Sequence, residues 1–144
     1  MIHIVTDSTA DVPAEFVRDL NITVVPAHVI FGRFAEVYRR LGGEILSIHL
    51  PAKLSSLFST AFAGSQLVPE ARVTLFDTGS LAMGSGWQVI AAARAAQAGH
   101  TMEEIIRLLE ARRPRVRGYS ALDTLDYVRR SGRVSWARAM LGQL

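Results

Sequence analysis

The sequence predicts an α/β fold in which a mostly parallel sheet carries helices on both faces. The first observation is that apolar runs of four to seven residues alternate along the chain with longer helical patterns. The second is that these runs are apolar throughout, as in strands that are covered on both sides. The third is the length of 144 residues with 49% hydrophobic residues, which suits one domain with a sizeable core.

The first part of the chain predicts a strand, a helix and a second strand. A short buried strand is expected over 2–6 and a helix over 12–20, with Asp11 as its N-cap because a carboxylate can accept the free N–H groups of a first turn. The stretch 22–31 is rich in β-formers. Pro26 lies inside it and indicates an edge position or a break.

The middle of the chain continues the alternation. A helix over 34–41 is followed by a strand over 44–50, a helix over 55–68 and a strand over 71–77. Each strand is short enough to be buried between two helical layers.

The last part predicts two neighbouring helices and one more strand. A long, Ala-rich helix is expected over 81–99, and Thr101 with Glu104 forms a capping box that opens a helix to about residue 112. The final elements expected are a strand over 116–122, a helix over 124–130 and a helix from Val134 onward.

Charge and composition bound the function. Residues 1–111 hold eight basic and eleven acidic side chains, whereas residues 112–144 hold eight arginines and two aspartates. The basic end is either a solvated surface or a patch for an acidic protein, a phosphate or a nucleic acid. No stacking-module motif accompanies it, so nucleic acid is not an expected partner. The sequence lacks a run that could span a bilayer, a secretory signal and any cysteine, which fits a cytoplasmic protein.

Polar side chains follow several predicted strands where the strands end. Asp7, Ser8 and Thr9 follow the first strand, and Asp77 with Ser80 follows the fourth. Because the carboxyl ends of parallel strands share one edge of a sheet, these groups and the helix starts after them can converge on one anion. The alternative is that each of them only caps the helix that follows.

We find no specific catalytic or metal-binding motif in the sequence. The four histidines have no metal-ligand spacing, so neither a metal nor another cofactor is expected. Ser80 or Ser55 with His49 and Asp77 would supply the chemistry of a triad, but no spacing selects that set. No catalytic residue is therefore assigned.

Several stretches together resemble one family. IVTDSTADVPAEF, EILSIHLPAKLSSLFSTA, ARVTLFDTGSLAMG and LDTLDYVRRSGRVSWARAMLG resemble the DegV family of bacterial fatty-acid-binding proteins in order and spacing. The resemblance implies a three-layer α/β/α N-terminal domain over 1–133 of a two-domain protein, with 134–144 starting a truncated second domain or linker helix. It also implies an apolar tunnel for a long-chain fatty acid, and a carrier that presents the carboxylate to a separate fatty acid kinase rather than an enzyme.

The family's site residues transfer only in part. Its serine contact to the carboxylate falls on Ser55, with Ser56 next to it in place of the family's glycine. The resemblance also implies that about thirty residues, including a second hydroxyl contact, are missing at 32–34. Secondary candidates for the fatty acid are Asp7, Ser8, Thr9 and Ser80, and candidates for a kinase or phosphate partner are Arg129, Arg130 and Arg133.

Two further readings stay open. One is a small phosphoryl- or acyl-transfer enzyme that uses Asp7, Ser8 and Asp77 at the strand edge. The other is a basic interaction module that binds no lipid and relies on the arginine-rich end.

Overall fold

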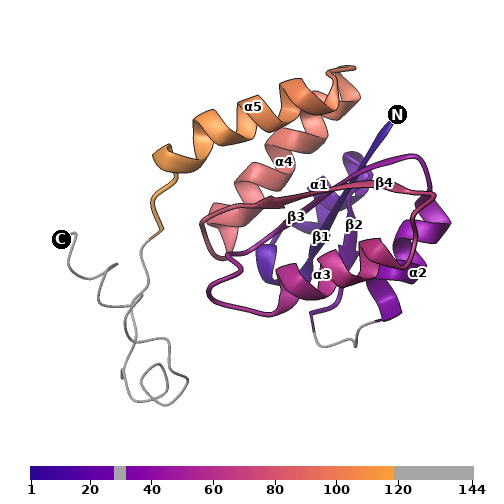
Figure 1. Ribbon diagram of the computed structural model, residues 1–144. Helices are drawn as coiled ribbons and strands as arrows, with labels where there is room; N and C mark the ends of the chain where they lie inside the picture. The colour runs from indigo at the N-terminus through magenta and orange to yellow at the C-terminus, as the bar shows by residue number, and fades with distance from the viewer. Residues whose placement is uncertain (28–31, 119–144) are drawn as a thin grey trace, which may run out of the picture.

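The computed structural model describes residues 1–27 and 32–118, which form a parallel sheet with helices on both faces (Figure 1). The predicted fold class is confirmed. In chain order the elements are β1 (Ile2–Asp7), η1 (Ser8–Ala10), α1 (Ala14–Asp19), β2 (Thr23–Val25), α2 (Gly32–Leu41), β3 (Glu44–His49), α3 (Leu57–Gln66), β4 (Arg72–Asp77), α4 (Met83–Gln97), α5 (Met102–Arg112) and η2 (Arg113–Arg115).

The four strands lie in the order β2-β1-β3-β4 and every pair is parallel. β1 pairs with β3 from Ile2 opposite Glu44 to Thr6 opposite Ile48. The chain leaves β1 for β2 on one side and later returns to β3 on the other. The order of the strands therefore reverses between β1 and β3.

Two apolar cores hold the layers together. On one face, Ile4, Leu46 and Ile48 of the sheet pack with residues of α4 and α5, including Val89 and Ile105. The other face buries a second cluster against α2 and α3. Its members are Val5, Val25, Phe34, Ala35, Tyr38, Ile45, Ala61, Val68 and Ala71. Alternate residues of β1 and β3 thus serve opposite cores, as the two-residue period of a strand requires.

The predicted start of the first helix is wrong. Asp11 adopts a left-handed conformation (φ 51°) at the end of η1, and α1 begins later, after Pro13 as its N-cap. The short 3-10 turn η1 ends directly before Asp11, and its N-cap is Asp7, whose carboxylate accepts the N–H of Thr9.

Two other local expectations are confirmed. β2 is an edge strand of the described sheet and ends at Val25, directly before Pro26. The capping box of α5 forms in full, since Thr101 accepts the N–H of Glu104 and Glu104 accepts the N–H of Thr101.

The C-terminal expectations are tested only at their start. Residues 116–118 form no strand, so the predicted strand over 116–122 does not begin at its expected residue. Several predicted features lie outside the described residues: the rest of that strand, the end of the stretch 22–31, the helices over 124–130 and from Val134, and Arg129, Arg130 and Arg133. Within residues 1–27 and 32–118, no helix is both long and apolar enough to cross a membrane.

Candidate functional site

The candidate site lies at the carboxyl end of the sheet, where β1 and β3 are neighbours. In open α/β sheets this point of reversed strand order is where loops diverge and leave room for a ligand. Asp7 is the last residue of β1 and His49 the last residue of β3. The parallel register brings these two residues, 42 positions apart in the sequence, to the same place.

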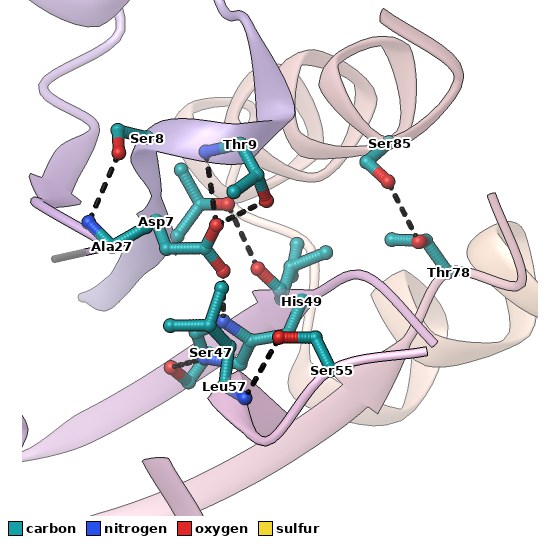
Figure 2. Close-up of polar contacts among 12 residues, drawn as sticks. Asp7, Ser8, Thr9, Ala27, Ser47, His49, Ser55, Leu57, Thr78 and Ser85 are labelled. Atoms are coloured by element: carbon teal, nitrogen blue, oxygen red, sulfur yellow. Dashed lines mark hydrogen bonds and ion pairs between the residues drawn. The ribbon is translucent and has the colours of Figure 1, made fainter. Parts of the chain in front are cut away.

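Asp7 and His49 form a buried pair (Figure 2). The Nδ1 atom of His49 lies 2.6 Å from the Oδ2 atom of Asp7, and neither residue is more than 1% exposed. The other carboxylate oxygen of Asp7 accepts both the N–H (3.0 Å) and the hydroxyl of Thr9. The carboxylate is therefore fully engaged and faces inward.

The pair continues into a chain of hydrogen bonds. The Nε2 atom of His49 lies 2.8 Å from the hydroxyl of Ser47, which in turn lies 2.8 Å from the hydroxyl of Tyr38 on α2. Ser47 and Tyr38 are completely buried. Two phenyl rings meet the imidazole edge to face, Phe34 at 5.2 Å and Phe58 at 6.5 Å between ring centres.

The hydrogen-bond chain has one direction that satisfies every donor. An ionised carboxylate can only accept, so Nδ1–H of His49 donates to Asp7. A neutral imidazole then accepts at Nε2 from Ser47, and Ser47 accepts from Tyr38. With a doubly protonated imidazole the order would reverse and leave the hydroxyl hydrogen of Tyr38 without an acceptor among the described residues. The geometry thus favours neutral His49.

The same surroundings shift two pKa values. Burial alone raises the pKa of Asp7, but the hydrogen bonds from His49 and Thr9 outweigh it and hold that pKa below its ordinary value. Burial raises the pKa of Tyr38 to about 12, although its hydrogen bond with Ser47 opposes the shift. At neutral pH the chain therefore contains a carboxylate and a protonated phenol.

Ser55 and Ser56 lie in the loop from β3 to α3. α3 runs back along the sheet, so its N-terminus lies at the same edge as Asp7 and His49. The Oγ atom of partly buried Ser55 accepts the N–H of Leu57 at 3.2 Å. Ser56 is the exposed N-cap of α3 and its side chain makes no capping bond. Both expected contacts thus stand at a helix start, where a negative ligand is stabilised.

The remaining candidates secure loops. Asp77 accepts the N–H groups of Gly79 (2.8 Å) and Ala52 (3.1 Å), which ties the loop after β4 to the loop after β3. Ser8 accepts the N–H of Ala27 at 3.0 Å. Ser80 is buried and its carbonyl oxygen accepts the hydroxyl of Ser85 at 2.7 Å. Each carboxylate, Asp7 and Asp77, thus joins its own loop to β3 or to the loop that follows β3.

An open hollow lies beside this edge, between η1, α1 and β2. It has a volume of about 580 Å³, and Ser8, Val12, Val17 and Val24 are among its lining residues. Ser55 does not line it. Within residues 1–27 and 32–118 no three potential metal ligands come together.

The structure pairs His49 with partners other than those the sequence offered. The triad set aside in the sequence analysis would have combined His49 with Asp77 and with Ser80 or Ser55, whereas His49 contacts Asp7 and Ser47. Because Ser47 is wholly buried against Tyr38, this arrangement offers no nucleophile to a substrate. The sequence did contain a signal for the pairing of His49 with Ser47. The two residues are two positions apart in β3 and therefore lie on the same face of the strand.

Comparison with known proteins identifies a family for this chain. A family model described as "Uncharacterised protein, DegV family" matches residues 1–39 and 31–144. A DegV domain-containing protein of Streptomyces coelicolor is 34% identical over 98% of this chain, and one of Deinococcus radiodurans is 31% identical over 99%.

A solved structure shows the same fold. It is described as the fatty-acid binding of a DegV family protein from Thermus thermophilus, with 28% identity and a TM-score of 0.81 over 99% of this chain. The structure of DegV from Bacillus subtilis, at 24% identity, matches with the same TM-score.

The chain is shorter than these proteins, and one difference is internal. It covers 63% and 64% of the two curated relatives and 64% of the Thermus chain. The alignment to the Streptomyces protein has 178 positions against 144 residues here, so at least 34 positions of that protein have no counterpart. The two family matches meet between residues 31 and 39, which agrees with the interruption predicted at 32–34. With a family match from end to end, the chain belongs to the DegV family.

Proposed function

We propose that this protein binds a long-chain fatty acid and that Ser55 contacts its carboxylate. The observation that carries the proposal is the structural match to the Thermus protein, which is described as binding a fatty acid and which aligns with 99% of this chain. The carboxyl edge of the sheet is the place for the head group, because hydroxyls and a helix N-terminus gather there.

Ser55 suits this role by its hydrogen bonds. Its oxygen already accepts the N–H of Leu57, so its hydroxyl hydrogen can donate to a carboxylate without disturbing the loop. Ser56 is exposed beside it and can add a second hydroxyl. Ser8 is the secondary candidate most exposed to solvent, whereas Asp7, Thr9 and Ser80 make hydrogen bonds within the protein that hold the loops.

The proposal describes a carrier rather than a catalyst. A phosphoryl-transfer enzyme would need a carboxylate free to act as a base, yet Asp7 is buried against His49, and Asp77 is bound by two backbone N–H groups. We extend the proposal to presentation of the bound carboxylate to a separate fatty acid kinase, with Arg129, Arg130 and Arg133 as partner contacts. Turnover of ATP and a fatty acid by the chain alone would instead favour the enzyme reading.

Extraction of lipid from the purified protein, followed by mass spectrometry, tests the proposal. We expect a bound acyl chain, or uptake of added palmitate or oleate. Replacing Ser55 with alanine should weaken affinity by about tenfold or more, since a hydrogen bond to a charged group contributes about 1.5–3 kcal/mol. Ser59→Ala, an exposed serine on the same helix, is the matched control. A preparation that holds no lipid and takes up neither acid would overturn the proposal.

A further inference from the structure

The centre of the hydrogen-bond chain is a histidine that none of the roles above uses. His49 is the only residue of the described chain that touches the carboxylate of Asp7 at one ring nitrogen and the hydroxyl of Ser47 at the other. Its ring also packs at nearly right angles against the rings of Phe34 on α2 and Phe58 on α3. One side chain thus contacts β1, α2 and α3 from the end of β3.

The contacts of His49 lead to both loops that flank the proposed head-group site. Through Asp7 it reaches η1, because the same carboxylate accepts the N–H and hydroxyl of Thr9. Through Phe58 it reaches the first turn of α3, next to the Leu57 N–H that Ser55 accepts. The two loops are far apart in sequence, and Figure 2 shows Asp7 and Thr9 of the first near His49, with Ser55 and Leu57 of the second close by.

We infer that His49 is a positioning residue. It fixes the position of η1 relative to the loop between β3 and α3, which contains Ser55. It does so through its bonds to Asp7 and Ser47 and its contact with Phe58. This inference deepens the proposed function and rests on it only where a fatty acid is the probe. A ligand then meets hydroxyls and N–H groups that are already in place, which lowers the ordering cost of binding.

The inference requires one tautomer of His49 at neutral pH. Its proton is on Nδ1, because the carboxylate of Asp7 can only accept, and Nε2 is bare, because it accepts from Ser47. Nitrogen NMR of the wild-type imidazole reads this directly and needs no variant. A proton on Nε2 with a bare Nδ1 at neutral pH would overturn the inference, because His49 could then not donate to the carboxylate of Asp7.

Amide hydrogen exchange tests the coupling without any ligand. In His49→Leu, exchange at the amides of Thr9 and Leu57 should become at least about tenfold faster, while the amides of β3 stay protected. His49→Asn keeps an N–H donor near Asp7 but lacks the ring, so it should restore protection at Thr9 and not at Leu57. His49→Asn also keeps the test decisive where His49→Leu fails to fold. The matched control is His100→Leu, at an exposed histidine before α5.

Fatty-acid affinity completes the test. With oleate as the probe, His49→Leu should bind at least about tenfold more weakly than wild type, and His100→Leu should bind as wild type does. If wild type holds no lipid and binds neither oleate nor palmitate, the proposed function fails, yet the exchange result still decides the role of His49. Unchanged exchange at both Thr9 and Leu57 in folded His49→Leu, or equal exchange in His49→Asn and His49→Leu, would refute the inference.

Discussion

Replacing Ser47 with alanine tests the direction of the buried hydrogen-bond chain through protein stability. Ser47 stands between Nε2 of His49 and the hydroxyl of Tyr38, each 2.8 Å away, and all three residues are buried. Its removal leaves one acceptor and one donor without a partner among the described residues. Each such orphan costs about 1–3 kcal/mol, so Ser47→Ala should lower the free energy of unfolding by about 2–6 kcal/mol.

Tyr38→Phe should cost much less than Ser47→Ala. Ser47 keeps its acceptor on His49 and loses only the hydrogen bond that it accepts, which is worth about 1 kcal/mol. In the double variant the phenyl ring no longer carries an orphaned hydroxyl. Its cost should therefore fall about 2–4 kcal/mol short of the sum of the two single costs, because it avoids both the orphaned hydroxyl and the hydrogen bond lost in Tyr38→Phe.

Urea unfolding of the four proteins, followed by circular dichroism at neutral pH, measures this cycle. The slopes of free energy against urea should agree among the variants, so that the midpoints report stability alone. Costs that add to within about 0.5 kcal/mol would refute the assigned chain. A Tyr38→Phe cost as large as that of Ser47→Ala would show that Ser47 donates to Tyr38 and that the direction is reversed.

Four further predictions follow from the structure. The pKa of Asp7 is held below its ordinary value, so the stability that its carboxylate contributes is complete above about pH 4 and is lost as the pH falls through the lower pKa of the folded state. The free energy of unfolding should therefore decline more steeply with falling pH in wild type than in Asp7→Asn. Parallel curves for the two proteins would contradict this. Ala82→Gly should raise the free energy of unfolding by about 1 kcal/mol, since Ala82 has φ 47° and ψ −135°, and a lower urea midpoint would oppose this reasoning. Gly86→Ala should cost about 1–3 kcal/mol, because the added Cβ would lie 2.4 Å from the carbonyl oxygen of Ala10; an unchanged melting temperature would count against that close approach. Thr101→Ala should cost about 1 kcal/mol while Thr101→Ser stays near wild type, and equal losses in the two would show that the capping hydroxyl is not what matters.

Features that depend on neighbouring residues could be predicted from the sequence. The capping box of α5 needs only Thr101 and Glu104, three positions apart, and it forms as expected. The alternation of apolar runs and helical patterns needs only local periodicity, and it gave the fold class. The N-cap preference of aspartate gave a wrong prediction at Asp11, because another local structure competes there. The 3-10 turn capped by Asp7 ends at Asp11, which adopts a left-handed conformation instead of capping α1.

The centre of the site could not be predicted because it depends on strand order. Asp7 and His49 meet only because β1 and β3 are neighbours, and no local pattern states which strands adjoin. The pairing with Ser47 and Tyr38 then follows from which face of β3 turns toward α2. The carboxylate contacts expected at Ser55 and Ser56, and the partner contacts expected at Arg129, Arg130 and Arg133, remain predictions.

The position where this chain and its relatives differ in length is mechanically tied to the site. α2 begins at Gly32, and its Phe34 packs on His49 with ring centres 5.2 Å apart. Phe34 also abuts α3 so closely that a Cβ on Gly64 would lie 2.8 Å from it. An insertion or deletion before α2 preserves the site only if it leaves α2 in the same position against His49 and α3. Changes in the length of this segment and changes in the geometry of the carboxyl edge of the sheet must therefore evolve together. Any chimera that exchanges this segment with a relative must keep Phe34, His49 and Gly64 from the same protein.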